Sequence, residues 1–325
     1  MTQQEVQSCL PMDKTIEAVR EAYVAFSKGS VELAPVAHLD VSIHNGEIDI
    51  KSGYVEDFGL IGTKIASGFY DNQKMGLPPG VAIIVLMDLR TSMPLAVMDG
   101  TYITAYRTGA AGAVAASLLA RRDSAKVGLV GAGTQARMQV LALNEVFSLE
   151  EIQVWDIIDK AGIDYAREMS DRMGIDVTAK DNVESVVRGA DIVVTVTPSR
   201  EALVNAEWVE KGVHINAIGA DGPGKQELDP MIVKKADKIV VDSMAQCRKI
   251  GEIQHALSQG LIAETDIHAE IGQILIGKKA GRETEDEITL FDSTGIAAQD
   301  IAAAYVVLEQ AKSRDLGRTI NLLDT

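Results

Sequence analysis

The chain has 325 residues, of which 46% are apolar and 24% are charged. This length corresponds to about two domains at roughly 100–200 residues each, and the apolar fraction excludes a chain that is disordered throughout. The 47 acidic residues outnumber the 31 basic ones, for a formal net charge of -16. Such a surface repels nucleic-acid phosphates and anionic lipids, so neither is an expected partner.

No stretch approaches the roughly 18 uninterrupted apolar residues that a membrane helix requires. The first residues also lack the basic start and apolar run of a signal peptide. Two cysteines, Cys9 and Cys247, are too few for a disulfide framework and fit a reducing cytosol. The five histidines show no metal-ligand spacing. We therefore expect a cytoplasmic protein that binds no metal, no membrane and no nucleic acid.

The first third of the chain predicts a helix followed by a sheet. Residues 12–28 form an amphipathic helix, because Ile16 and Val19 begin an apolar stripe at helical spacing. Strand-like runs punctuated by glycine and asparagine follow, which indicates an antiparallel or mixed sheet. These runs are 36–43, 48–54, 60–67, 81–88 and 95–99. An alanine-rich helix is predicted over 104–121.

From Lys126 onward, apolar strand-length runs alternate with helical segments. The runs are 127–133, 152–156, 190–197, 214–221, 238–242 and 287–293. Runs of this kind are typical of a parallel sheet covered on both faces. The predicted fold is therefore α/β: an N-terminal α+β domain over 1–115 and a Rossmann-type doubly wound parallel sheet domain over 116–299. A last helix, 297–313, packs back on the first domain, which the C-terminal segment 300–325 completes.

A glycine-rich turn joins the first of these runs to a helix. Gly131, Gly133 and Ala136 form the G-x-G-x-x-A pattern of dinucleotide-binding turns. The glycines permit a tight turn and close approach of the backbone to a pyrophosphate, and the helix N-terminus offers free amides. The alternative is a glycine turn with a purely conformational role.

Asp156 ends the next predicted strand, where an acid can accept both ribose hydroxyls and repel a 2′-phosphate. This favours NAD over NADP as the cofactor, although Arg137 lies close enough in sequence to tolerate a phosphate. The alternative for Asp156 is a solvated acid or a cap at the strand end.

Three blocks in this order resemble the ornithine cyclodeaminase/mu-crystallin family. They are MDGTYITAYRTGAAG (98–112), AEWVEKGVHINAIGADGPGKQELD (206–229) and FDSTGIAAQD (291–300). The resemblance covers essentially the whole chain, and it is greatest to the archaeal-type NAD-dependent alanine dehydrogenases. It implies that the first domain binds substrate and forms a homodimer through its sheet. It also implies that the second domain binds NAD and that the active site lies between the two.

The resemblance also implies roles for single residues. Lys64 matches the lysine that contacts the substrate carboxylate, Asp221 matches the acid–base aspartate, and Arg107 matches an arginine at the junction of cofactor and substrate. The remaining positions that match cofactor contacts are Thr134, Gln135, Asp156, Thr197, Asn216, Ala217, Lys225 and Ser293.

Two departures from the family pattern concern the substrate half. The family's carboxylate-binding arginine, which follows a proline in an early strand, is missing from 35–38, and the next cation is Lys51. A lysine lacks the two-pronged guanidinium fork, so substrate orientation could differ. Pro79 stands where the family often has threonine. Segments 48–54 and 64–72 resemble the ectoine-degradation branch instead.

Oxidation of an amino acid at its α-carbon requires a fixed carboxylate and a group that moves protons. Lys51, Lys64 and Arg107 can supply the positive charge, and Asp221 can act as general acid–base. Each also has a structural alternative: the lysines as solvated strand residues, Arg107 as the partner of an acid, and Asp221 as a turn former.

The sequence therefore predicts an NAD-dependent dehydrogenase that oxidatively deaminates a small L-amino acid, with L-alanine, pyruvate and ammonia as the favoured reactants. The alternatives are a cyclodeaminase or ectoine-pathway deaminase that recycles the hydride on NAD, a reductase of cyclic imino acids, and a non-catalytic ligand-binding protein.

Overall fold

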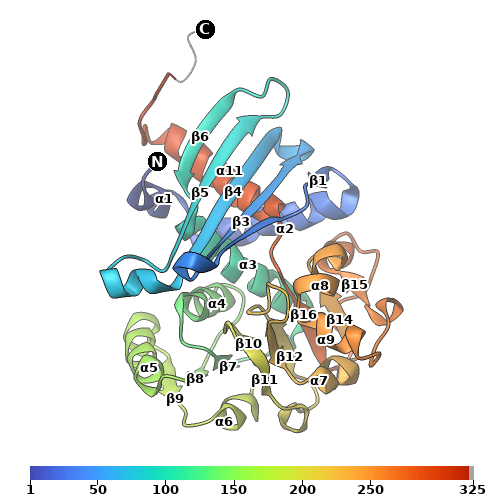
Figure 1. Ribbon diagram of the computed structural model, residues 1–325. Coiled ribbons are helices and arrows are strands. Elements are labelled where there is room, and N and C mark those ends of the chain that lie inside the picture. Colours follow the sequence, from blue (N-terminus) through green and yellow to red (C-terminus); the bar gives the residue numbers. More distant parts are fainter. Residues whose placement is uncertain (322–325) are drawn as a thin grey trace. The chain divides into compact units, whose positions relative to one another are not determined.

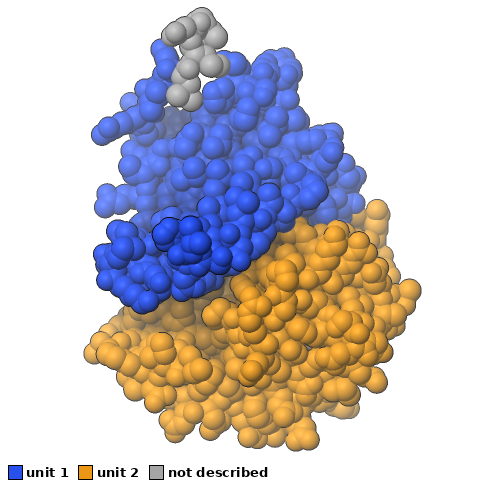
Figure 2. All heavy atoms as spheres, in the orientation of Figure 1, with its two compact units in different colours: residues 1–107, 296–325 blue, residues 108–295 orange. Residues whose placement is uncertain are grey.

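The computed structural model describes residues 1–321, and the chain forms two compact units (Figure 1; Figure 2). Unit 1 comprises residues 1–107 and 296–325, and unit 2 comprises residues 108–295. The sequence placed these divisions later, at 115/116 and 299/300. They differ because the long helix α3 (Thr101–Leu119) contributes residues to both units. Residues 322–325 of the expected C-terminal segment lie outside the described residues.

Unit 1 is an antiparallel sheet with helices packed on one face (Figure 1). Its strands are β1 (Val31–Leu33), β2 (Ala37–Val41), β3 (Gly46–Val55), β4 (Leu60–Phe69), β5 (Gly80–Asp88) and β6 (Pro94–Asp99). The strand order is β1-β3-β4-β5-β6, and β2 also pairs with β3. Its complete helices are α1 (Gln3–Cys9), α2 (Met12–Lys28) and α11 (Ala297–Ser313).

The strands of unit 1 alternate between a buried and an exposed face. In β5, Ala82, Ile84 and Leu86 are buried, whereas Val81 and Ile83 are about half exposed. This period of two is what a strand with one covered face produces. The last helix, α11, packs against α2 and against β3 and β4 on the covered side.

Unit 2 is a parallel sheet with helices on both faces. Its sheet strands are β7 (Lys126–Val130), β8 (Glu151–Trp155), β9 (Asp176–Ala179), β10 (Ile192–Thr195), β12 (His214–Ala217), β14 (Lys238–Val241), β15 (Ala269–Glu270) and β16 (Thr289–Asp292). Its helices after α3 are α4 (Thr134–Asn144), α5 (Asp159–Met173), α6 (Val183–Val187), α7 (Pro230–Lys235), α8 (Met244–Ile250), α9 (Ile253–Ser258) and α10 (Ile271–Leu275). A separate parallel pair joins β11 (Arg200–Val204) to β13 (Gln226–Leu228).

The order of the strands in unit 2 confirms the predicted doubly wound fold. Across the sheet it runs β15-β14-β16-β12-β10-β7-β8-β9. The strands β8 and β9 are added on one side of β7 and the later strands on the other, so the order of the strands reverses between β7 and β10. Alternate residues of β10 enter two separate cores, Ile192 and Val194 on one face and Val193 on the other. Ligands of such folds bind at the carboxyl ends of the strands, beside the reversal.

Several predicted bounds are wrong in detail. The run 214–221 is a strand only as far as Ala217, so Asp221 lies in the loop after β12 rather than at a strand end. The predicted helix 104–121 begins and ends earlier, as α3 does. The short elements α1, β9, β11, β13 and β15 were missed, because few of their residues carry a periodic apolar pattern.

Candidate functional site

Unit 1 buries a cluster of charged side chains under α11. Lys64, on the covered face of β4, and Lys51, its cross-strand partner on β3, face the same side of the sheet. The Nζ of Lys64 lies 2.9 Å from either carboxylate oxygen of Asp300 and donates a hydrogen bond to Oδ1. Arg107 donates from Nε to the same oxygen over 2.9 Å. Thus Asp300 joins two of the predicted substrate-binding residues. Arg107 therefore pairs with an acid, which is the alternative role that the sequence suggested for it.

The neighbouring Gln299 holds this cluster in place. Its Oε1 accepts from Nη1 of Arg107 over 3.4 Å and from the backbone N–H of Ile296 over 2.8 Å. Its Nε2 donates to the hydroxyl of Tyr23 over 2.8 Å. Since these side chains are all buried, the helix start and α2 fix the position of the guanidinium.

The cluster holds more positive than negative charge, and this shifts its protonation. Lys64 is 3% exposed. Its burial, followed by repulsion from Arg107, lowers its pKa to about 7, although Asp300 acts in the opposite direction. Burial alone would raise the pKa of Asp300, but Arg107 and Lys64 together hold it below the usual value. A lysine near neutrality can both bind a carboxylate and exchange a proton.

In unit 2, the glycine-rich turn has the form that a dinucleotide requires. Gly131 has φ +105° at the end of β7, a conformation that favours glycine. Gly133 caps α4 without any side-chain hydrogen bond, and the space beside its Cα is open. Thr134 is exposed, and Oε1 of Gln135 is buried without a hydrogen-bond partner among the described residues. The turn therefore offers unused amides for a pyrophosphate and an unused acceptor for a ligand hydroxyl or amide.

Asp156 and Arg137 hold this turn from two sides. Oδ2 of Asp156 accepts from the N–H of Ala132 over 2.8 Å, and its Oδ1 accepts from Ile158 N–H over 2.9 Å. A carboxylate has further lone pairs, so Asp156 can still accept ribose hydroxyls. Arg137 donates to the carbonyls of Ala132 and Gly133 and binds Glu168 through Nε and Nη2. The guanidinium of Arg137 is therefore already occupied by hydrogen bonds within the protein.

Four other predicted residues of unit 2, Thr197, Asp221, Lys225 and Ser293, lie in the loops that follow the strands. Asp221 is 50% exposed and pairs with Nζ of Lys225 over 2.6 Å. Thr197 lies beside Gly131, since a Cβ on that glycine would meet Cγ2 of Thr197 at 3.0 Å. The Ser293 hydroxyl donates to Oδ2 of Asp242 over 2.9 Å.

The two predicted cofactor contacts on β12 have fully buried side chains. Asn216 is fully buried, where its Oδ1 accepts from Nε2 of His214 and its Nδ2 donates to the carbonyl of Gly112. The methyl group of Ala217 is also buried, at the end of β12. Neither side chain faces the surface in this structure.

Sequence reasoning missed Asp300, Gln299 and Glu227. Asp300 and Gln299 end the block 291–300 that carried the family resemblance, which was the available signal. Glu227 is fully buried, and burial raises its pKa to about 7 against hydrogen bonds from Thr195 and Thr197.

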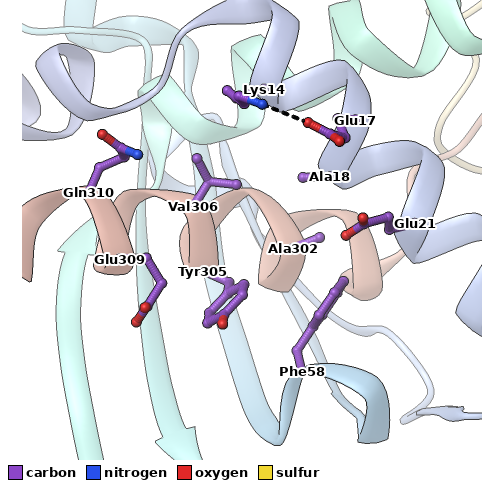
Figure 3. Close-up of a pocket in the computed structure, with 10 residues that line it drawn as sticks. All are labelled: Lys14, Glu17, Ala18, Glu21, Phe58, Ala302, Tyr305, Val306, Glu309 and Gln310. Carbon is purple, nitrogen blue, oxygen red and sulfur yellow. Dashed lines mark hydrogen bonds and ion pairs between the residues drawn. The ribbon is translucent and has the colours of Figure 1, made fainter. Parts of the chain in front are cut away.

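The cavity drawn in Figure 3 belongs to unit 1 and has a volume of ≈ 310 Å³. Its wall includes Glu21 of α2, Glu309 of α11, and the stacked rings of Phe58 and Tyr305. None of the predicted site residues lines it. The cavity therefore gives no support to the predicted dehydrogenase chemistry.

Among residues 1–321, no helix is both long and apolar enough to cross a membrane. Over the same part of the chain, no group of three or more His, Cys, Asp or Glu side chains could hold a metal ion.

Fold and turn together define a dinucleotide-binding α/β protein with a separate α+β unit. The sequence profile of the ornithine cyclodeaminase/mu-crystallin family matches residues 1–315. The chain belongs to that family, as its resemblance predicted.

Several relatives show what the chain is similar to. It is 45% identical to an alanine dehydrogenase of Archaeoglobus fulgidus over 98% of this chain and 97% of that protein. A solved archaeal alanine dehydrogenase dimer with bound NAD superposes with a TM-score of 0.94 at 44% identity, covering 99% of this chain and 98% of the other. The Thermococcus litoralis Δ1-pyrroline-2-carboxylate reductase, solved with NADH and L-proline, gives a TM-score of 0.95 at 37% identity and covers 98% and 99%.

Proposed function

We propose that this protein is an NAD-dependent dehydrogenase that oxidatively and reversibly deaminates a small L-amino acid, with L-alanine as substrate and pyruvate and ammonia as products. The observation that carries the proposal is the buried cluster of Lys64, Arg107 and Asp300, whose excess positive charge suits one carboxylate. The similarity to an alanine dehydrogenase over nearly the full chain supports the choice of alanine.

In this proposal unit 1 binds the substrate. Lys64 and Arg107 donate to the substrate carboxylate with the N–H groups that Asp300 leaves unused, since an ammonium has three donors and a guanidinium five. Lys51, on the same side of the sheet, adds positive charge. These contacts hold the α-carbon in one orientation, which is the main requirement of hydride transfer.

Unit 2 supplies the cofactor half and the acid–base group. The residues at the glycine-rich turn would hold NAD, with Asp156 on the ribose, and NAD supplies the hydride acceptor when bound. Thr197, Lys225 and Ser293 belong to the same proposed binding surface. Asp221, half exposed in its loop, accepts the proton of the water that hydrolyses the imine.

A second candidate is a reductase of cyclic imino acids. It is favoured by the similarity to the pyrroline-2-carboxylate reductase, whose TM-score matches that of the alanine dehydrogenase. Its substrate also carries a carboxylate next to a C=N carbon, so the same basic cluster would serve it.

We also propose that the protein is a cytoplasmic homodimer. The uncovered face of the unit 1 sheet exposes the apolar side chains of Ile65, Val81, Ile83, Leu95 and Val97. An apolar face of this kind marks a protein interface, and a second copy of the same sheet would cover it. Ile83→Lys should convert a dimer to a monomer in light scattering, and a persistent dimer would place the interface elsewhere. Both cysteines are free and buried, as in a reducing compartment.

One assay tests the function. Purified protein is incubated with NAD and single amino acids while NADH absorbance and ammonia are followed together. Net NADH with stoichiometric ammonia from L-alanine supports the proposal. In the reverse direction, with NADH supplied, oxidation of NADH by pyrroline-2-carboxylate but not by pyruvate and ammonia supports the second candidate. Ammonia and proline from ornithine without net NADH would contradict both, as would inactivity towards every substrate.

A further inference from the structure

A buried carboxylate in unit 2 connects two loops at the carboxyl edge of the sheet. Glu227 lies on β13 and is fully buried. Its Oε1 accepts from the backbone N–H of Thr197 over 2.5 Å and from its hydroxyl over 2.8 Å. Its Oε2 accepts from the Thr195 hydroxyl over 2.7 Å and from the N–H of Gly219 over 2.8 Å. One side chain thus ties the loop after β10 to the loop after β12.

The contact with Gly219 leaves no room for a side chain. A Cβ at this position would lie 2.2 Å from the carbonyl oxygen of Thr197 and 2.6 Å from Oε1 of Glu227. The backbone at Gly219 therefore lies directly on the carboxylate, two residues before Asp221. A displaced side chain at Glu227 would therefore press directly on the backbone of this loop.

The backbone of Glu227 is itself held by a second acid. Both oxygens of Glu252, which is 2% exposed, accept from the N–H of Glu227 over 3.1 Å, and one also accepts from Leu228 over 2.7 Å. The four donors that bind its side chain, together with the fixed backbone, hold Glu227 in one position.

We infer that Glu227 is a positioning residue. It fixes Thr197 for contact with the cofactor and Asp221 for proton transfer, and it touches neither the cofactor nor the substrate. This inference rests on the proposed function for the roles of Thr197 and Asp221. No other described side chain accepts from both loops.

The test uses Glu227→Gln in the full chain, with the exposed Glu207→Gln as a control of equal charge change. Glutamine keeps the length of the side chain, but its amide nitrogen cannot accept from the N–H of Gly219. We expect kcat/KM to fall about ten- to hundredfold, with a fall in kcat and a rise in the KM for NAD, as leaving the buried N–H of Gly219 without its acceptor implies. Hydrogen–deuterium exchange should quicken in segments 196–199 and 217–222 and stay unchanged in Glu207→Gln.

Wild-type exchange in both segments together with wild-type kcat and KM would overturn the inference. If Glu227→Gln does not fold, Glu227→Asp keeps the charge, shortens the side chain by one methylene, and is judged by the same two measurements. Binding of NAD to the wild type is measured first by calorimetry. Its absence would remove the proposed function, while the exchange data would still decide whether Glu227 positions the loops.

Discussion

Lys64 and Asp300 are 236 positions apart in the chain and meet as a buried ion pair at 2.9 Å. The pairing depends on α11, which carries Asp300 across the covered face of the unit 1 sheet. Arg107 shares the same carboxylate. One acid therefore balances two cations that would otherwise repel each other in the interior.

Replacing this acid should impair both binding and stability. In Asp300→Asn the two cations lose their counter-charge, and the pKa of Lys64 falls further because Asp300 is the group that raises it. We expect the KM for alanine at pH 7 to rise about ten- to hundredfold. We expect stability to fall by roughly 3 kcal/mol, the low end for a broken buried pair, because Lys64 can shed its proton. Steady-state kinetics and thermal unfolding measure the two effects.

The exposed Asp57→Asn serves as the control, since Asp57 lies in the same unit away from the cluster. If Asp300→Asn keeps the wild-type KM and Tm, the carboxylate has no part in holding the cluster.

The pKa of Lys64 predicts how carboxylate binding changes with pH. A group with a pKa of about 7 is an ammonium below that pH and a neutral amine above it. Propionate, the alanine skeleton without its amine, should therefore bind more weakly as pH rises from 6 to 9, by about tenfold for each pH unit above 7. Competitive inhibition constants give the profile. Propionamide, equal in size and uncharged, should show no such slope.

Lys64→Met provides the second arm of this experiment. It should bind propionate weakly and with little dependence on pH. A flat wild-type profile, or a slope that survives in Lys64→Met, would assign the titration to another group.

Local pattern was sufficient to predict most of the fold. The helices over 12–28 and 297–313 were predicted with the bounds that the structure gives, because their ends and apolar faces are clear in the sequence. The glycine-rich turn was predicted because its conformational demand falls on glycine alone. The end of β12 was not, since its apolar run continues through Ala217 and Ile218 into the loop.

The site was predicted only in part, because its contacts join distant segments. Sequence suggested that Arg107 could pair with an acid but could not say which one, as Asp300 reaches it only through the packing of α11. Glu227 could not be predicted for the same reason, since its donors come from the end of β10, from the loop that follows it and from the loop after β12. Burial, which gives such acids their properties, is a tertiary quantity.

Asp221 should be essential for turnover and dispensable for cofactor binding. Asp221→Asn keeps the size of the side chain and a hydrogen-bond acceptor for Lys225 while removing the proton acceptor. We expect kcat to fall about 10²–10⁴-fold, the usual contribution of a general acid–base, with the Kd for NAD within a few-fold of wild type. Kinetics and calorimetry measure these quantities, and the exposed Asp181→Asn is the control. Undiminished turnover would remove Asp221 from the mechanism.

Cofactor preference should change in two steps. Asp156→Ala removes the ribose acceptor and the hydrogen bond to Ala132 N–H, so NAD binding should weaken about tenfold and discrimination against NADP should relax. Arg137 cannot yet bind the 2′-phosphate because Glu168 occupies it. Adding Glu168→Gln weakens that ion pair and should improve the Kd for NADP further.

Glu168→Gln alone is the matched control for this pair, since Asp156 still repels the phosphate in that variant. Calorimetric titration with NAD and NADP gives two affinities for each protein, and their ratio is the cofactor preference. An unaltered preference in the double variant would show that the ribose is recognised by other residues.

Buried Asp292 should make the stability of the protein depend on pH. Burial raises its pKa to about 8, and its Oδ1 has no hydrogen-bond partner among the described residues. A carboxyl whose pKa is raised in the folded state binds an extra proton there, so its contribution to stability decreases as pH rises from about 4 to 8. Asp292→Asn is neutral at every pH and lacks this slope. Its Tm relative to wild type should therefore increase between pH 5 and 9, while the exposed Asp286→Asn should show no such trend. A constant difference across that range would mean that Asp292 does not take up its proton on folding.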